Sequence, residues 1–482
     1  MSLYRFLTLC TTVGLLLILA NGNNSAQQSG LQKPTPLPED IEKAWAAAGA
    51  EIGWMRIDVR MYDPMRLTFA SRDEGQKGDI PAFRLRAWQA GLLSKLPEPE
   101  VPYGLDLTKL PFTDRWLVDL RGLKNLQALN LAGSQITGAG LKELAGLKNL
   151  QWLSLLGTQI TDMELKELVG LKNLQTLDLW GTQITDAGLK ELAGLNNLQT
   201  LNLASTKITG AGLKELARLK NLQRLDLSWT PRITDAELKE LAALKNLQWL
   251  NLAATQITDA GLKELAALKN LQWLNLYSTP ITDEGLKELA ELKNLQTLNL
   301  GTSNKKITDA GLKQLAGLKN LQTLHLTAEN ITDAGLKELA ALKNLQTLHL
   351  TAENITDAGL KELAALKNLQ ALHLNGTKIT DAGLKELAAL KNLQWLNLER
   401  TQITDAGLKE LAALKNLKTL HLNGTQITDA GLKELAGLKS LQVLVLILDN
   451  WGITNIKITD AGVEELRKVL PNCDIRKIEL GR

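Results

Sequence analysis

The chain is poor in cysteine, in histidine and in aromatic residues other than tryptophan. It has two cysteines in 482 residues, four histidines, four phenylalanines and four tyrosines, against eleven tryptophans. Cys10 lies in an expected leader, so the mature chain retains only Cys473 and no intrachain disulfide is expected. We expect Cys473 to pack as a small apolar residue.

Catalytic signatures are also missing. The sequence has no HExxH, CxxC, nucleophile elbow or independent phosphate-binding loop, and its glycine-rich matches all come from glycines that recur with a fixed period. We therefore expect no enzyme activity and no cofactor. The 55 basic and 52 acidic residues give a net charge of +3. This balance offers no electrostatic case for a nucleic-acid or anionic-membrane partner.

Long hydrophobic runs are limited to the N-terminus. After Arg5, residues Phe6 to Ala20 form an apolar run of 15, shorter than the ~20 residues of a membrane-spanning helix. Small residues follow, up to Ala26. This pattern predicts a secretory signal peptide over residues 1–26 and a secreted or periplasmic protein, with an uncleaved anchor as the alternative. The polar residues 27–38 are expected to form a linker.

A repeat of 24 residues fills most of the remaining chain. Fourteen copies run from Leu123 to Val469; eleven are 24 residues long, and the copies beginning at Leu318 and Leu342 are identical. One copy reads LKNLQTLDLWGTQITDAGLKELAG, which we number from its first leucine. A fixed period in this range predicts a solenoid, in which each unit buries its apolar face against its neighbours.

The repeat predicts a strand and a short helix in every copy. Leucines at positions 7 and 9 alternate with variable residues at 6, 8 and 10, as in a strand with one buried face. Positions 16–23, DAGLKELA, form an apolar stripe at helical spacing, and threonine 15 or aspartate 16 can cap this helix. Threonine 12 can satisfy backbone groups of the loop.

Positions 4–14 read L-x-x-L-x-L-x-x-T-x-I, which resembles the leucine-rich repeat. The likeness covers about 70% of the chain (residues 123–469). It is strongest to bacterial secreted leucine-rich-repeat proteins and to the repeats of F-box proteins, although no F-box is recognisable. The resemblance implies an α/β solenoid curved as a horseshoe, with a parallel sheet on the concave side and short helices on the convex side.

Both ends of the array need capping. Residues 39–102 are expected to form an N-terminal cap with a helix near Pro38–Ala50, strands over 55–61 and 67–70, and a helix over 82–96. Residues 103–122 look like a degenerate first repeat. Residues 470–482 are expected to form a C-terminal cap with a closing strand at 474–480.

The best candidates for function are residues that vary against the repeated background. Large aromatic side chains at positions 6, 10 and 11 are expected to face solvent from the sheet or its edge, and aromatic clusters near arginine are typical of binding hot spots. Three consecutive repeats contribute the predicted patch of Trp229, Trp249, Trp273 and Tyr277. The full set of candidate partner-binding residues is Trp152, Trp180, Arg224, Trp229, Trp249, Trp273, Tyr277 and Trp395. The alternative is that the tryptophans only stack on one another.

All four histidines occupy position 8: His325, His349, His373 and His421. The first three are on adjacent repeats and predict a ladder that responds to pH or binds a divalent metal, or else a tolerated residue copied by duplication. In the identical copies, Glu329 and Glu353 replace threonine 12. We expect these carboxylates to turn into solvent or to share a cation or proton.

Three insertions break the period, at 231–232, 303–306 and 449–457. All follow the strand, so they are expected to project from one rim, as a binding rim or as tolerated loop variation. The sequence thus favours a scaffold that binds a partner protein on its concave face. A self-associating envelope component and an F-box-like ubiquitin-ligase adaptor are the alternatives.

Overall fold

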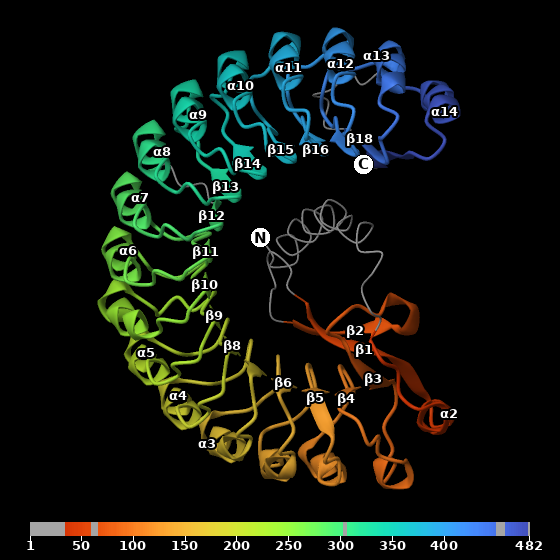
Figure 1. Cartoon of the computed structure of the whole chain (residues 1–482), viewed down its shortest axis with the longest axis vertical. Helices are drawn as coiled ribbons and strands as arrows, with labels where there is room; N and C mark the ends of the chain where they lie inside the picture. Colours follow the sequence, from red (N-terminus) through yellow and green to blue (C-terminus); the bar gives the residue numbers. More distant parts are fainter. Residues whose placement is uncertain (1–33, 59–65, 302–305, 450–457, 481–482) are drawn as a thin grey trace. The chain divides into compact units, whose positions relative to one another are not determined.

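A computed structural model describes residues 34–58, 66–301, 306–449 and 458–480. These residues form two compact units, an N-terminal one that ends at Ile257 and a C-terminal one that begins at Thr258. Within each unit, strands line the inner side of the curve and short helices line its outer side, as the solenoid expectation requires (Figure 1). The expected signal peptide lies outside the described residues.

The N-terminal unit begins with a small antiparallel sheet and continues with strand–helix repeats, several of whose helices are 3₁₀ helices (labelled η). In chain order its elements are α2 (Glu39–Ala47), β1 (Ala50–Asp58), β2 (Arg66–Ser71), η2 (Arg72–Glu74), β3 (Ile80–Leu85), η3 (Leu93–Lys95), β4 (Tyr103–Asp106), η4 (Asp114–Leu120), β5 (Leu126–Asn130), η5 (Leu141–Gly146), β6 (Trp152–Ser154), α3 (Asp162–Leu165), η6 (Lys166–Gly170), β7 (Thr176–Asp178), α4 (Asp186–Leu192), β8 (Thr200–Asn202), η7 (Gly210–Gly212), α5 (Leu213–Leu216), β9 (Arg224–Asp226), η8 (Asp235–Ala243) and β10 (Trp249–Asn251).

The C-terminal unit is more regular, and most of its helices are seven-residue α-helices. Its elements are α6 (Asp259–Leu265), β11 (Trp273–Asn275), α7 (Asp283–Leu289), β12 (Thr297–Gly301), α8 (Asp309–Leu315), β13 (Thr323–Thr327), α9 (Asp333–Leu339), β14 (Thr347–Thr351), α10 (Asp357–Leu363), β15 (Ala371–His373), α11 (Asp381–Leu387), β16 (Trp395–Asn397), α12 (Asp405–Leu411), β17 (Thr419–His421), α13 (Asp429–Glu434), η9 (Leu435–Gly437), β18 (Val443–Asp449), α14 (Asp460–Val469) and β19 (Asp474–Leu480).

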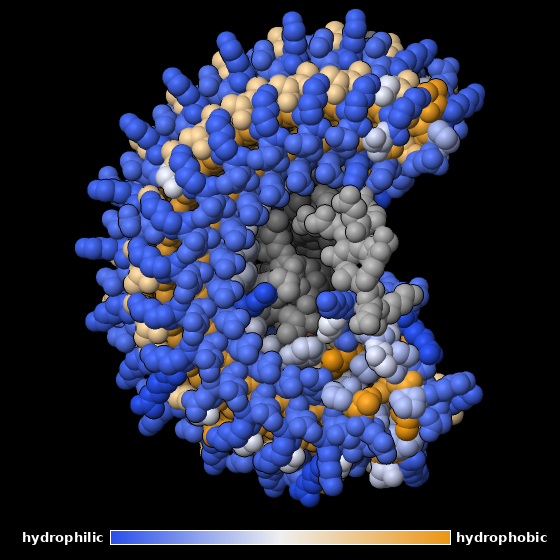
Figure 2. Space-filling model, viewed as in Figure 1, coloured by the Kyte–Doolittle hydropathy of each residue, from blue (hydrophilic) through white to orange (hydrophobic). Residues whose placement is uncertain are grey.

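Strands of successive repeats pair in parallel, one full repeat apart. For example, His325 of β13 pairs with His349 of β14, which pairs with His373 of β15. The recurring leucines and isoleucine form the core: in the repeat that begins at Leu342, all seven have no exposed surface. Figure 2 shows that hydrophilic residues dominate the visible surface and that a band of apolar residues follows the helices.

A carboxylate–threonine bond joins the helix of one repeat to the helix start of the next. Asp333 accepts hydrogen bonds from the backbone N (2.9 Å) and Oγ1 (2.6 Å) of Thr356, the N-cap of α10. Thr356 Oγ1 in turn accepts from the N of Ala358. Threonine 15 therefore caps its own helix, as expected, whereas aspartate 16 serves the following repeat. The bond recurs at every C-terminal junction from Asp259–Thr282 to Asp429–Thr459.

This bond explains the glycine at position 18. A Cβ on Gly359 would lie 2.4 Å from Asp333 Oδ1, so the carboxylate leaves no room for a side chain. Two repeats of the N-terminal unit reverse the pair. Where position 16 is glycine, at Gly138 and Gly210, position 18 of the next repeat is Glu164 or Glu237, whose side chain fills the vacated space.

In the reversed junctions the glutamate takes over the missing bond. Glu164 accepts from the N and Oγ1 of Thr161, and Glu237 accepts from Thr234 Oγ1. The threonine is thus bonded within its own repeat, and the hydrogen bond between repeats is lost. Both helices that follow contain 3₁₀ structure, η6 and η8, unlike the regular α-helices of the C-terminal unit.

The N-terminal cap confirms three expected elements and corrects a fourth. Helix α2 and strand β2 lie where the sequence predicts them; β1 begins five residues before the strand expected over 55–61, of which 59–61 are not described; and the helix expected over 82–96 is wrong. Residues Ile80–Leu85 form β3, antiparallel to β1 and parallel to β4, followed only by a short 3₁₀ turn. The strand is favoured over the helix because it buries Ala82 and Phe83 completely, with the Phe83 ring stacked 3.9 Å from the ring of Trp45 of α2.

The C-terminal end closes as expected. Helix α14 begins at Asp460 and is capped by the side chain of Thr459, and β19 pairs in parallel with β18. Cys473 is buried and unpaired, and burial, followed by the nearby Asp474 charge, raises the pKa of its thiol to about 11. Its expected packing role is confirmed, and a thiol that stays protonated at neutral pH is a poor nucleophile.

Candidate functional site

Side chains at positions 6, 8 and 10 point away from the leucine core, onto the strand face of each unit. In the N-terminal unit, the exposed large hydrophobic side chains near this face are Trp180, 41% exposed at position 10, and Trp229, 50% exposed at position 11. Trp180 follows β7 and Trp229 follows β9, two strands further along. Because only β8 separates β7 from β9, the backbones of the two residues lie about two strand spacings (~10 Å) apart, at the same end of the strand face.

Trp229 adopts a backbone conformation that bulky residues avoid. Its φ is +57°, in the left-handed region, because position 11 turns the chain the same way in successive repeats. Most other repeats place glycine, serine or alanine there, as at Gly181 and Ser205. A side chain in this conformation costs roughly 1 kcal/mol relative to glycine. Strained residues of this kind cluster at functional sites.

Arg224 lies on the strand face in the same repeat as Trp229, at the start of β9. It is half-buried at position 6 of β9, in register with Thr200 of β8 and Trp249 of β10. Burial lowers the pKa of its guanidinium, and no carboxylate of the described chain lies within ion-pair distance of it. The nearby Asp226 carboxylate is already bonded to Ser228 N (2.8 Å) and Asn251 Nδ2 (3.0 Å). A partly desolvated cation without an anion favours an external acceptor.

Trp152 belongs to the packing of the cap. It contacts the buried cluster of Met55, Leu67, Ala82 and Ala128, in which strands β1 and β2 meet the first repeats. Asn130 Nδ2 also donates to the carbonyl of Leu67 (3.1 Å). The cap therefore covers the strand face at β5 and β6, and Trp152 is better placed to hold the cap than to meet a partner.

Two further tryptophans do not face solvent as expected. Trp249 is 6% exposed and Trp395 is 2% exposed. Trp395 is stacked 3.7 Å from His373 and lies 5.0 Å from His421. The alternation of the strand predicts the side on which a residue lies, but it does not predict that side-chain neighbours on that side bury the residue, as the rings of His373 and His421 do for Trp395. Trp273 and Tyr277, on and after β11 of the C-terminal unit, are half-buried, and their membership of one patch with Trp229 stays a prediction.

The histidines form the expected ladder. The rings of His325 and His349 lie 5.4 Å apart, and those of His349 and His373 are stacked at 4.2 Å with an interplanar angle of 8°. Burial lowers the pKa of His325 to about 3 and of His349 to about 4, and lowers the pKa of His373 well below its usual value. Repulsion from neighbouring imidazoles adds to the effect at His325 and His373.

The ladder geometry argues against the metal hypothesis. Lone pairs of stacked imidazoles lie in parallel planes, so they cannot converge on one ion at the ~2.0 Å that nitrogen ligands need. Within the described residues no group of three or more histidine, cysteine, aspartate or glutamate side chains is arranged to hold a metal. Glu329 and Glu353 are exposed, which favours the solvent-facing alternative for this pair.

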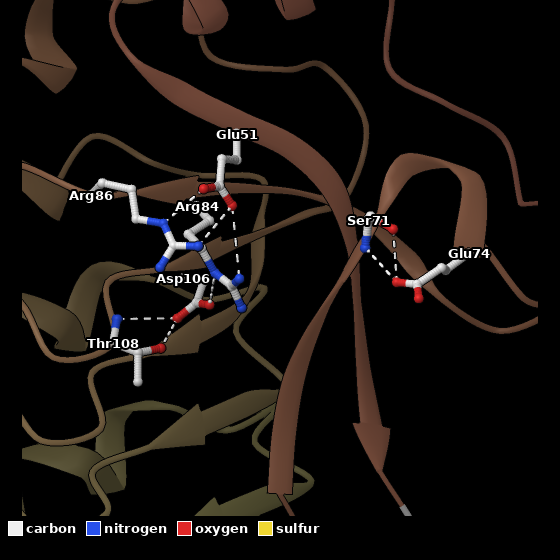
Figure 3. A network of polar contacts seen from close by, with 7 residues as sticks. All are labelled: Glu51, Ser71, Glu74, Arg84, Arg86, Asp106 and Thr108. Atoms are coloured by element: carbon white, nitrogen blue, oxygen red, sulfur yellow. Dashed lines mark hydrogen bonds and ion pairs between the residues drawn. The ribbon is translucent and has the colours of Figure 1, made fainter. Parts of the chain in front are cut away.

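A polar network joins the cap to β4, the strand of the degenerate first repeat (Figure 3). Arg84 Nε donates to Asp106 Oδ2 (2.7 Å), and Arg86 Nε donates to Glu51 Oε1 (2.7 Å), whose pKa is lowered mainly by this bond. Asp106 also accepts from the N of Thr108 (3.0 Å). Each charge of the network has a partner within it, so it holds the cap in place.

The remaining candidates are unpromising or lie outside the described chain. Most of the second and third insertions fall on 302–305 and 450–457, which are not described, whereas Pro231 and Arg232 are exposed. A cleft of about 800 Å³ lies between α14 and β19, but Lys477 in it pairs with Asp460, and Arg467 with Glu464. Across residues 34–58, 66–301, 306–449 and 458–480, no helix has the length and apolarity to cross a bilayer.

Comparison with known families agrees with the geometry. A family model described as a leucine-rich repeat region matches residues 110–358, and two further leucine-rich-repeat models match 343–403 and 391–434. The chain is a leucine-rich-repeat protein. Its solved structural relatives include a leucine-rich-repeat protein of Leptospira interrogans, 30% identical with a TM-score of 0.54, covering 78% of this chain and 96% of the other.

An internalin of Listeria monocytogenes, internalin F, is 26% identical with a TM-score of 0.47, over 76% of this chain and 90% of the internalin. No curated protein matches the sequence. The family assignment confirms the repeat and the solenoid. Solenoids of this kind present extended binding surfaces, and the residues of this leucine-rich-repeat protein that would use such a surface must be argued from its own side chains.

Proposed function

We propose that this leucine-rich-repeat protein is an exported scaffold that binds a partner protein on the strand face of its N-terminal unit. Trp180 and Trp229 would supply the apolar contact area, and Arg224 would supply the charged contact. The observation that carries the proposal is Trp229, because a large aromatic side chain is kept half exposed in a strained backbone conformation that neighbouring repeats give to small residues.

The composition of this surface supports a protein partner. Tryptophan and arginine are the residues most enriched among binding hot spots, and they cluster at the centre of interfaces. Ser205, in the repeat before Trp229, is half-buried and adds a hydroxyl next to the aromatic anchor, whereas Thr200 and Asn202 of β8 are buried. Export rests on the predicted signal peptide and stays a proposal with the rest.

The test compares the wild type with the double variant Trp180→Ala/Trp229→Gly and with a control. Met163→Ala removes a side chain that is 76% exposed on α3, away from the strand face. Each protein is used to capture partners from the extracellular fraction of its source, and captured proteins are purified and titrated by interferometry. We expect the double variant to lose about thirtyfold in affinity, the size of a hot-spot loss of about 2 kcal/mol. The control should bind like the wild type.

A second variant, Arg224→Gln, tests the charged contact separately and should lose affinity more strongly at low salt. Equal affinity of all four proteins would refute this site. A wild type that captures nothing but self-associates with rising concentration, measured by sedimentation, would favour the structural alternative instead.

A further inference from the structure

One edge of the C-terminal unit carries a row of lysines. Position 2 of each repeat lies in the turn that leads from a helix into the next strand. In this unit it is lysine in all eight repeats, and every one of these residues is exposed. We call this row the lysine edge; its members are Lys269, Lys293, Lys319, Lys343, Lys367, Lys391, Lys415 and Lys439.

The lysine edge is almost free of negative charge. In the eight turns, from position 23 to position 5, the one acidic residue is Glu291, and Lys418 adds another cation. Lys269 pairs with Glu291 at 3.4 Å. Lys343, Lys367 and the other members have no carboxylate within ion-pair distance in the described chain. Although the net charge of the protein is small, positive charge is therefore concentrated along this edge.

A second ladder holds the row at a regular spacing. Nδ2 of the asparagine at position 3 donates to the carbonyl of the lysine one repeat earlier, for example Asn368 to Lys343 (2.9 Å) and Asn392 to Lys367 (2.9 Å). The same bond recurs from Asn294 to Asn416. The backbones of neighbouring lysines are thus held at a spacing between the ~4.8 Å of strands and the ~10 Å of helices.

The helix surface beside the row differs. In helices α6, α7 and α9–α13, lysine at position 20 is followed by glutamate at position 21, as in Lys361–Glu362 and Lys385–Glu386, whereas α8 has Gln314 at position 21. Each helix also carries the aspartate at position 16, so acidic residues equal or outnumber basic ones there and no row of unbalanced positive charge forms on the helices. The lysine edge is the part of this unit where unbalanced positive charge follows a line.

We propose that the lysine edge binds a linear anionic polysaccharide that runs along successive repeats. A single file of point charges matches a flexible polymer with regularly spaced sulfate or carboxylate groups. The turns contain neither aromatic residues nor arginine, the side chains that stack on bases in single-stranded nucleic acids. Their leucines, at positions 1 and 4, are buried in the core, and the turns contain no tryptophan that would insert into a bilayer interface.

This inference is independent of the strand-face site and can be tested separately. The probes are heparin and polygalacturonate, which present sulfate and carboxylate groups respectively. The variant Lys343→Gln/Lys367→Gln/Lys391→Gln/Lys415→Gln removes four charges from the edge. The control Lys337→Gln/Lys361→Gln/Lys385→Gln/Lys409→Gln removes four charges from helices α9–α12, so both variants have the same net charge. Circular dichroism melting checks that both remain folded.

Each lysine near an anionic surface contributes about fivefold to binding, so four should contribute on the order of several hundredfold at low salt. We expect the edge variant to lose affinity by that factor for at least one polysaccharide, and the helix control to change by less than about threefold. The Trp180→Ala/Trp229→Gly variant should bind the polysaccharide normally.

Equal losses in the two quadruple variants would overturn the proposal, because only net charge would then matter. So would a wild type that binds neither polysaccharide. Tighter binding to an oligothymidylate or to phosphatidylglycerol vesicles than to both polysaccharides would also overturn it and would assign the edge to that other polyanion.

Discussion

At most junctions, position 16 is aspartate and position 18 of the next repeat is glycine; at the two reversed junctions, position 16 is glycine and position 18 is glutamate. This predicts that a junction tolerates the substitution of both residues but not of either one alone. The junction between the two identical repeats is the best place to test this, because Asp333 there accepts two bonds from Thr356 and faces Gly359. The perturbations are Asp333→Gly, Gly359→Glu and the double variant, which recreates the native Gly210/Glu237 arrangement.

Each single change should destabilise this junction. Asp333→Gly removes two hydrogen bonds to a charged acceptor, worth ~1.5–3 kcal/mol each when buried and about half that at this partly exposed site. Gly359→Glu forces a Cβ to within 2.4 Å of Asp333 Oδ1 and brings two carboxylates together. We expect a loss of roughly 2–4 kcal/mol for each single variant.

The double variant should recover most of the loss. The glutamate introduced by Gly359→Glu would occupy the space left by the aspartate and accept from Thr356 Oγ1, as Glu237 accepts from Thr234. We expect the double variant to lie within about 2 kcal/mol of the wild type, which gives a coupling free energy of at least ~2 kcal/mol in a double-mutant cycle.

Hydrogen exchange is the suitable assay, since a long solenoid opens locally and one global free energy does not describe it. Amide protection in α10 gives the local free energy for each protein of the cycle. Gly317→Ala is the matched control, because its Cβ meets only ordinary contacts. Additive losses, with the double variant as unstable as the two single changes combined, would refute the reasoning.

Three further predictions concern individual side chains. The lowered pKa values of His325, His349 and His373 mean that the unfolded chain binds more protons than the folded one below pH ~6.5. The free energy of unfolding should therefore fall on acidification, by about 2 kcal/mol per histidine between pH 7 and pH 5. The melting temperature of the His349→Asn variant should depend less on pH than that of the wild type. An equal pH dependence of the two proteins would contradict the burial of the ladder. Trp395→Ala should cost ~3–5 kcal/mol, because it empties a buried site, and a melt like the wild type would show that the ring is not packed. Trp229→Gly should raise local stability by about 1 kcal/mol by relieving the left-handed strain, and a loss in hydrogen-exchange protection would indicate a structural role.

The repeated part of the fold was predictable because the same pattern of leucines recurs in every copy of the repeat. Leucine spacing identified the core, and the alternation around positions 7 and 9 identified the strand face. The helix predicted over 82–96 failed because good helix formers there are overridden by tertiary pairing: β3 buries Ala82, Phe83 and Leu85 against β1 and α2. A sequence without repeats gives no second copy against which to check such a segment.

The candidate site was predicted in part. The sequence pointed to Trp180 and Trp229 as exposed rings, but it could not show that the cap packs on Trp152 or that His373 and His421 enclose Trp395. These burials depend on contacts between strands and across the cap. The strained backbone of Trp229 does have a signal in the sequence. Position 11 is glycine in many repeats, so a tryptophan at this position indicates backbone strain.

The two units differ in a way that bears on both proposals. The N-terminal unit holds both reversed junctions, Gly138/Glu164 and Gly210/Glu237, and it also holds the strained Trp229. Its repeats have diverged, as recognition of a single partner surface requires. The C-terminal unit contains the identical copies and the unbroken lysine edge. Copying a repeat cannot create a specific pocket, but it does extend a line of equal charges. Duplication of repeats is therefore expected to strengthen binding to a polymer, because each added repeat adds a lysine that can meet another unit of the polymer. It is expected to contribute little to the contacts around Trp180 and Arg224.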